Sequence, residues 1–143
     1  MAKIFLYLSV ALSGVGFLLS LVLHFVYILR RVKGVNWVGW SLFWGLFVTQ
    51  ILIAYSFALT GAVDIENRTL NWQVVFQGCP YWMKITAFAF IVYGVIFVNV
   101  IFWKVIPNLV SNPWELFTKC MSCVFIANYA WAFAILYSAS RIL

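Results

Sequence analysis

Neutral polar side chains inside long apolar runs are the residues of this sequence best placed to do chemistry. The candidates are His24 in the first run, Thr49 and Gln50 in the second, Asn99 in the third and Asn128 in the fourth. His24 and Asn99 lie a few residues inside one end of their runs, whereas Gln50 and Asn128 lie near the middle of theirs. If they face inward, they form two polar layers within one group of helices.

Helix packing is the role that we assign to these side chains, because hydrogen bonds between membrane helices stabilise their association by about 0.6 to 2 kcal/mol each. Two other roles stay open. Copies of Gln50 and Asn128 in a homo-oligomer would line a pore or ligand cavity, and a partner subunit in a larger complex would supply the hydrogen bonds. The sequence therefore predicts that His24, Gln50, Asn99 and Asn128 pack helices or line a pore.

A C-x-x-C motif, Cys120-Met121-Ser122-Cys123, lies at the start of the fourth apolar run, and its spacing suits a redox disulfide. Four membrane spans with this motif opening the fourth resemble the vitamin K epoxide reductase family, which passes electrons between thiols and a quinone. The resemblance implies a thiol/quinone redox enzyme that uses Cys120 and Cys123. The chain departs from the family because residues 32–36, in the first connection, lack its second cysteine pair, and Cys79 is expected on the opposite face. We therefore do not assign the chain to that family.

Other cofactor chemistry has little support in the sequence. A diheme membrane cytochrome of the four-helix type needs two histidines per heme, whereas His24 is the single histidine of the chain. Heme binding would need a ligand from a second copy or a partner. Since histidine and carboxylates do not cluster in the sequence, no metal site is predicted. We expect bound lipid and predict no cofactor, with heme or quinone as remaining alternatives.

The charged residues lie at the ends of the apolar runs or between them. The nine Lys and Arg residues are dispersed beside the runs, which is typical of membrane flanks and not of a basic surface for nucleic acid. Asp64, Glu66 and Glu115 all fall outside the runs. Because ion-coupled transporters commonly need a carboxylate within the membrane, this distribution argues against secondary active transport.

The composition of the chain requires a membrane around the elements that carry these residues. Hydrophobic residues make up 66% of the chain and charged residues only 8%, whereas a soluble domain is about 25% charged. The apolar runs predict one all-α domain over residues 1–143, a compact antiparallel bundle of four transmembrane helices at about 4–33, 37–60, 81–104 and 113–141. The connection over 61–84 is predicted to be polar or interfacial, since it mixes amides with Trp, Val and Phe.

Local signals mark the helix ends and the helix faces. Gly34 and Asn36 predict a tight first hairpin, and Asn112-Pro113-Trp114-Glu115 predicts a capped start for the fourth helix. Small residues recur at steps of three and four, which places each set on one face and predicts close helix contacts. The two sets are Ser9, Ser13, Gly16 and Ser20 in the first run, and Cys123, Ala127, Ala130, Ala134 and Ser138 in the fourth.

The orientation follows from the excess of Lys and Arg on the cytoplasmic side. One side holds Arg30, Arg31, Lys33, Lys104 and Lys119, and the other holds Lys3, Arg68, Lys84 and Arg141. Because the first group includes a cluster beside the first span, we expect both termini and the 61–84 connection outside the cytoplasm.

The function predicted from these features is that of a structural or accessory subunit of a larger membrane complex. A homo-oligomeric channel is the first alternative, and a thiol/quinone redox enzyme is the second. The expected partners are membrane lipids together with other subunits or further copies of the chain, and no nucleic acid.

Overall fold

The computed structural model describes the backbone of residues 1–29, 37–105 and 113–143, and the side chains of 1–29, 37–100 and 117–143. Within these ranges, four helices are long and apolar enough to cross a membrane, as predicted. They are α1 (Ala2–Leu29), α2 (Trp37–Thr60), α4 (Tyr81–Val105) and α5 (Pro113–Ile142). The capping signals at Gly34, Asn36 and Asn112, and the side chain of Glu115, lie outside the described residues.

The connection between α2 and α4 folds into a short hairpin and a short helix. Strand β1 (Val63–Asp64) pairs antiparallel with β2 (Thr69–Leu70), with Val63 opposite Leu70. The Asp64 carboxylate accepts hydrogen bonds from the Asn67 side chain and from the backbone N–H groups of Asn67 and Glu66. These bonds, the side-chain bond from Asn67 first, lower the pKa of Asp64 below its ordinary value.

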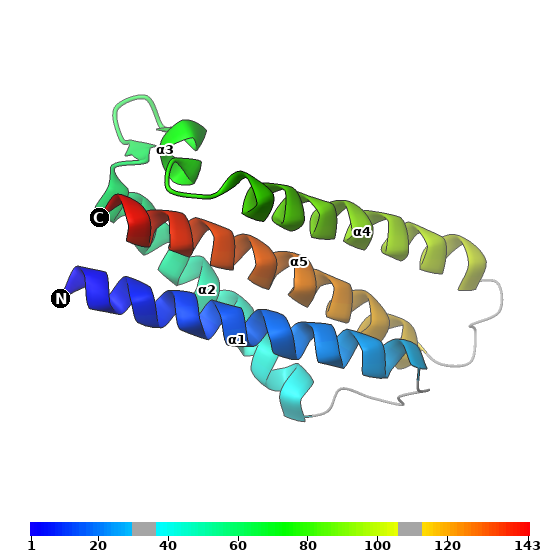
Figure 1. Cartoon of the computed structure of the whole chain (residues 1–143). Helices are drawn as coiled ribbons and strands as arrows, with labels where there is room; N and C mark the ends of the chain where they lie inside the picture. The colour runs from blue at the N-terminus through cyan, green and yellow to red at the C-terminus, as the bar shows by residue number, and fades with distance from the viewer. Residues whose placement is uncertain (30–36, 106–112) are drawn as a thin grey trace.

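Helix α3 (Trp72–Phe76) follows the hairpin and lies against the end of α5. The side chain of Asn71 caps α3 by accepting from the backbone N–H groups of Gln73 and Val74. Polar and aromatic contacts hold this segment to α5: the Gly78 N–H donates to Ser138 Oγ at 3.0 Å, and the Phe76 ring meets Trp131 edge-on with centroids 5.1 Å apart. Figure 1 shows α3, the hairpin and both chain termini at the same end of the molecule.

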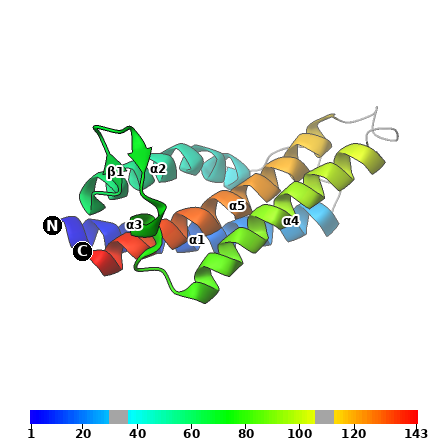
Figure 2. The ribbon, with the colours of Figure 1, turned by 90° about the horizontal axis from the view of Figure 1, so that it is seen from above.

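Helix α5 is the central element of the fold. The other three long helices and α3 all pack on it, and Figure 2 shows α2 and α4 on opposite sides of α5. Large side chains of α5 such as Phe125, Ile126 and Leu136 are almost fully buried, whereas α4 keeps most of its residues at the surface. Burial is therefore concentrated around one helix, and the flanking helices share few contacts with one another.

The predicted small-residue face of α1 lies against α5, whereas the predicted face of α5 is turned mainly toward α4 and the α3–α4 connection. On α1, Ser9, Ser13 and Ser20 are buried, and their hydroxyls donate to backbone carbonyls one turn earlier in the same helix. These serines thus enter an apolar interface without needing a partner on α5. On α5, four of the five predicted positions are buried and Ala127 is half-buried. Ala127 and Ala134 lie beside residues of α4, so the close approach of α1 to α5 depends mainly on the short side chains of α1.

Tyr129 of α5 fills the space between α1 and α2. Its side chain is 4% exposed, and its hydroxyl donates to the Leu42 carbonyl of α2 at 2.9 Å. A Cβ atom at Gly16 of α1 would lie 2.5 Å from the Tyr129 ring, and a Cβ atom at Gly45 of α2 would overlap the hydroxyl oxygen. Both glycines are therefore required by the size and position of one side chain.

We predict that Gly45→Ala destabilises the protein by about 1–3 kcal/mol, because the added methyl group overpacks the Tyr129 site. Removing the hydroxyl relieves the overlap, so Tyr129→Phe should recover part of that loss when combined with Gly45→Ala. Reversible unfolding by sodium dodecyl sulfate in bicelles measures both effects. Gly94→Ala is the control, since its Cβ atom would meet the nearest atoms of Cys123 at 3.9 Å and 4.0 Å, an ordinary contact. Equal losses for Gly45→Ala and Gly94→Ala would contradict the role of Tyr129.

Candidate functional site

A hydrogen-bonded amide network joins α2 to α5. Gln50 Nε2 donates to Asn128 Oδ1 at 2.6 Å, and Asn128 Nδ2 donates to Thr49 Oγ1 at 3.0 Å. The Thr49 hydroxyl in turn donates to the Leu46 carbonyl at 2.8 Å. Asn128 thus makes hydrogen bonds through both the oxygen and the nitrogen of its side-chain amide. Gln50 is exposed, and its one described hydrogen bond is the bond to Asn128.

A second polar cluster surrounds His24, which is 4% exposed and joins α1 to both α4 and α5. The Ser122 hydroxyl donates its only proton to the Lys119 carbonyl at 2.7 Å. Ser122 must therefore accept from His24 Nδ1–H, at 2.8 Å. In the neutral ring this tautomer leaves Nε2 to accept from the Tyr93 hydroxyl, at 2.7 Å. Three helices are linked through a single imidazole.

The structure brings together some of the predicted polar residues and separates others. Gln50 and Asn128, expected at the same depth, are in direct contact. His24 and Asn99 were also expected at one depth, but the described bonds of His24 run to Tyr93 and Ser122. Asn99 donates through Nδ2 to the Val95 carbonyl of its own helix at 2.7 Å. Asn99 therefore contributes no described hydrogen bond between helices.

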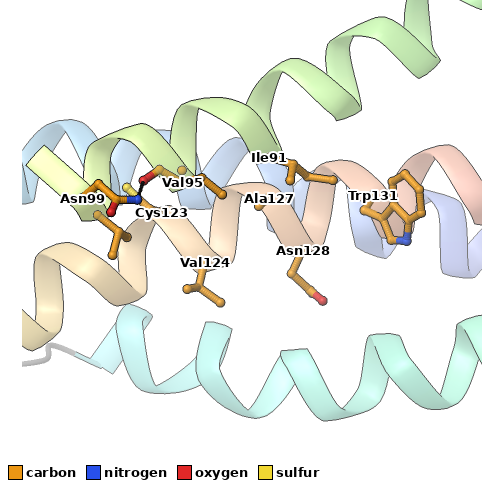
Figure 3. Close-up of a pocket in the computed structure, with 10 residues that line it drawn as sticks. Ile91, Val95, Asn99, Cys123, Val124, Ala127, Asn128 and Trp131 are labelled. Carbon is orange, nitrogen blue, oxygen red and sulfur yellow. Dashed lines mark hydrogen bonds between the residues drawn. The ribbon is translucent and has the colours of Figure 1, made fainter.

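An elongated cavity of about 520 Å³ lies between α4 and α5. Figure 3 shows its lining side chains, with Asn99 at one end and Trp131 at the other, and with Asn128 pointing toward α2. Gly94 and Ala127 belong to its wall, and most of the other lining residues are Ile or Val. The cavity is apolar except for its two amides, and it opens at the surface of the helix group.

The cysteines of the predicted redox motif are free thiols in this structure. Cys123 is buried, lies 3.8 Å from His24 Nδ1 and lines the cavity, whereas Cys120 is half-buried. Cys79, on the α3–α4 connection, is also buried, and burial raises the pKa of its thiol while the charge of Lys84 acts in the opposite sense. Among the described residues, no three His, Cys, Asp or Glu side chains are grouped closely enough to hold a metal ion.

Three residues of these sites were not singled out in the sequence: Tyr93, Ser122 and Tyr129. The hydroxyl of Tyr93 bonds a ring of another helix, and the phenol of Tyr129 fills a gap between two others. In a chain with seven tyrosines, neither has a distinguishing neighbour in the sequence. Ser122 lies inside the C-x-x-C motif. The spacing of that motif points to the chemistry of its two cysteines and gives no signal for the hydroxyl group between them.

Comparison of this chain with models of known protein families, with curated proteins and with solved structures found no match. Its function is therefore inferred from its own residues and their geometry.

We predict that Asn128→Leu weakens the fold more than Gln50→Leu, because Asn128 makes two bonds to α2 and Gln50 makes one. Each lost bond should cost about 0.6 to 2 kcal/mol. The double mutant should cost less than the sum of the single mutants, since both remove the same Gln50–Asn128 bond.

Unfolding in bicelles measures these differences, and Asn99→Leu is the matched control because its described bond stays within its own helix. Asn99→Leu should therefore leave the free energy of unfolding within about 0.5 kcal/mol of the wild type. A loss for Asn99→Leu as large as that for Asn128→Leu would contradict this interpretation of the network.

Proposed function

We propose that this chain is a small multi-pass membrane protein that acts as a structural or accessory subunit of a larger membrane complex. The four long apolar helices support the multi-pass assignment. In this proposal they cross the bilayer as an antiparallel bundle around α5, and residues 61–80 lie at the membrane surface. Exposed aromatic side chains at that end of the molecule, Trp72, Tyr81 and Trp82, fit the headgroup region, where Trp and Tyr are enriched.

The outer face of α2 carries a stripe of exposed large side chains that we call the α2 stripe. Its members recur at steps of three and four residues, so they share one face of the helix. They are Trp37, Trp40, Trp44, Phe47, Ile51 and Tyr55. Several of the rings contact each other or Phe43, so the aromatic surface of this face is continuous. Aromatic residues along the whole length of a helix exceed what two interfacial belts require.

The exposed amide of Gln50 carries the proposal. It lies beside the α2 stripe near the middle of α2, the position farthest from either membrane surface. Its bond to Asn128 uses one N–H group, and no partner for its carbonyl Oε1 is found among the described contacts. An unpaired polar group in hydrocarbon costs several kcal/mol. A polar side chain from another membrane helix packed on the α2 stripe would remove that cost.

The experiment compares two variants with equally exposed aromatic residues on different helices. Trp44 and Phe88 are each 64% exposed, on α2 and α4 respectively. Tagged protein is purified from its native membranes in mild detergent, and the mass and composition of the particle are measured. We expect unlike membrane chains to co-purify with the wild type and with Phe88→Ala, and to be lost with Trp44→Ala, because only Trp44 belongs to the proposed interface.

Two other outcomes would contradict the accessory role. A ring made only of identical copies, with a conductance in liposomes that changes in Gln50→Leu, would favour the channel alternative. A particle with the mass of one chain, unchanged when a milder detergent is used, would contradict both the accessory subunit and the channel.

The orientation is a separate proposal, based on the cluster of Arg30, Arg31 and Lys33 that follows the first span. We expect Gly34 on the cytoplasmic side, and Asn67 and Leu143 on the opposite side. In a background with the three native cysteines replaced by serine, Gly34→Cys should react with an impermeant maleimide only after the membrane is opened. Asn67→Cys and Leu143→Cys should react in intact cells. The reverse pattern would overturn the orientation, and labelling of Gly34→Cys and Asn67→Cys from one side would overturn the four-span topology.

A further inference from the structure

The cavity between α4 and α5 is a groove that the two helices cannot close by themselves. Gly94 on α4 and Ala127 on α5 have no side chain large enough to fill it, and Ile91, Val95 and Val124 form its apolar walls. Because α2 and α4 both pack mainly on α5, the described residues that line the groove come from α4 and α5 alone. Figure 3 shows the lining side chains of α4 and α5 with α2 standing apart from α4. In a bilayer this space requires another occupant.

The size of the groove selects the kind of occupant. A helix about 10 Å across rises 1.5 Å per residue, which corresponds to about 120 Å³ for each residue. The groove, at about 520 Å³, would therefore hold only about four residues of a helix, just over one turn. Its volume is instead in the range of about 300–1,000 Å³ that is typical of sites for small molecules. An elongated, slender and apolar molecule fits this shape.

Asn99 supplies one hydrogen-bonding group at the end of the groove. It lies six residues before the end of α4 at Val105, which is about 9 Å along the helix axis. Its amide uses one N–H group for the bond to Val95, so a second N–H group is left to donate. Farther along the groove, the Asn128 amide points toward α2 and bonds it through both its oxygen and its nitrogen (Figure 3), so it is not turned toward α4 as a second polar anchor. A ligand would therefore place a hydrogen-bond acceptor near Asn99 and an apolar chain toward Trp131.

We propose that this groove binds one acyl chain of a bilayer glycerolipid, with the ester carbonyl of that chain accepting a hydrogen bond from the Asn99 amide. The ester lies where the apolar chain meets the headgroup, which matches the position of Asn99 near the end of α4. No charged side chain lines the described part of the groove, so recognition rests on the ester and the chain and not on the headgroup. The proposal rests on the membrane insertion of the chain and is independent of any partner on the α2 stripe.

Photolabelling tests this site directly. The full chain is reconstituted in vesicles of phosphatidylcholine and phosphatidylglycerol that contain a trace of phosphatidylcholine with a diazirine in the middle of one acyl chain. After irradiation, labelled residues are mapped by peptide mass spectrometry. We expect label enriched on groove residues of α4 and α5 over the exposed outer face of α1. Native mass spectrometry of the gently purified protein should show one retained lipid.

Two pairs of variants separate binding from general contact with the bilayer. Ala127→Phe fills the groove and should abolish both the enrichment and the retained lipid, whereas Ala54→Phe, at an exposed position of α2, should change neither. Asn99→Leu should lower the enrichment about threefold, the factor given by one typical hydrogen bond within a membrane. Thr86→Val, at another exposed polar position of α4 whose hydroxyl bonds within its own helix, should leave it unchanged.

Several results would overturn the proposal. Label spread evenly over all lipid-facing helices would show that the groove has no preferred occupant, and so would unchanged label in both Ala127→Phe and Asn99→Leu. Displacement of the label by a sterol but not by unlabelled phosphatidylcholine would assign the groove to another class of molecule. Cross-linking of the groove to an unlike chain, without lipid, would assign it to a partner helix. Loss of co-purifying chains in Trp44→Ala tests the α2 stripe alone, so the two proposals can fail separately.

Discussion

The packing of Tyr129 between α1 and α2 is the constraint on which the other features of this structure depend. Its ring occupies space next to Gly16, and its hydroxyl reaches the Leu42 carbonyl past Gly45. Lipid tails are as apolar as the helix surfaces, so membrane helices gain little from burying apolar area and associate through close packing and hydrogen bonds. The Tyr129 side chain, packed against two glycines, provides both the close packing and a hydrogen bond between helices. It fixes the positions of α1 and α2 relative to α5 at a single level.

The two polar clusters follow from that arrangement. With α2 held on α5 through Tyr129, Asn128, the residue before it, comes within hydrogen-bonding distance of Gln50 and Thr49. With α1 held on the adjoining face, His24 comes to lie against Ser122, about two turns earlier on α5. Neither cluster could hold the helices without the close approach, because a hydrogen bond tolerates only a few tenths of an ångström of separation. Steric fit therefore places the polar groups, and the polar groups then specify the depth and rotation of each helix.

The long helices could be predicted from the sequence because hydropathy and helix breakers act locally. The contact of Gln50 with Asn128 was foreseeable for a related reason, since two amides at mid-span have few alternatives to each other. The partners of His24 could not be predicted. Tyr93 and Ser122 reach it only because of how α4 and α5 are rotated about their axes, and no local sequence signal indicates that rotation. Tyr129 was missed although Gly16 was noted as part of a small-residue face. Glycine in a membrane helix indicates close approach but does not identify the side chain that approaches.

The central position of α5 also explains why the molecule has unfilled surfaces. A helix has room around it for several neighbours, and here α1, α2 and α4 each use α5 as their main contact. The flanking helices then diverge, which leaves the groove beside Gly94 and Ala127 on one side and the outer face of α2 on the other. In water such surfaces would drive the helices together, but in a bilayer acyl chains and other helices can fill them at little cost. The arrangement around one helix thus leaves room for both the lipid and the partner helix that we propose.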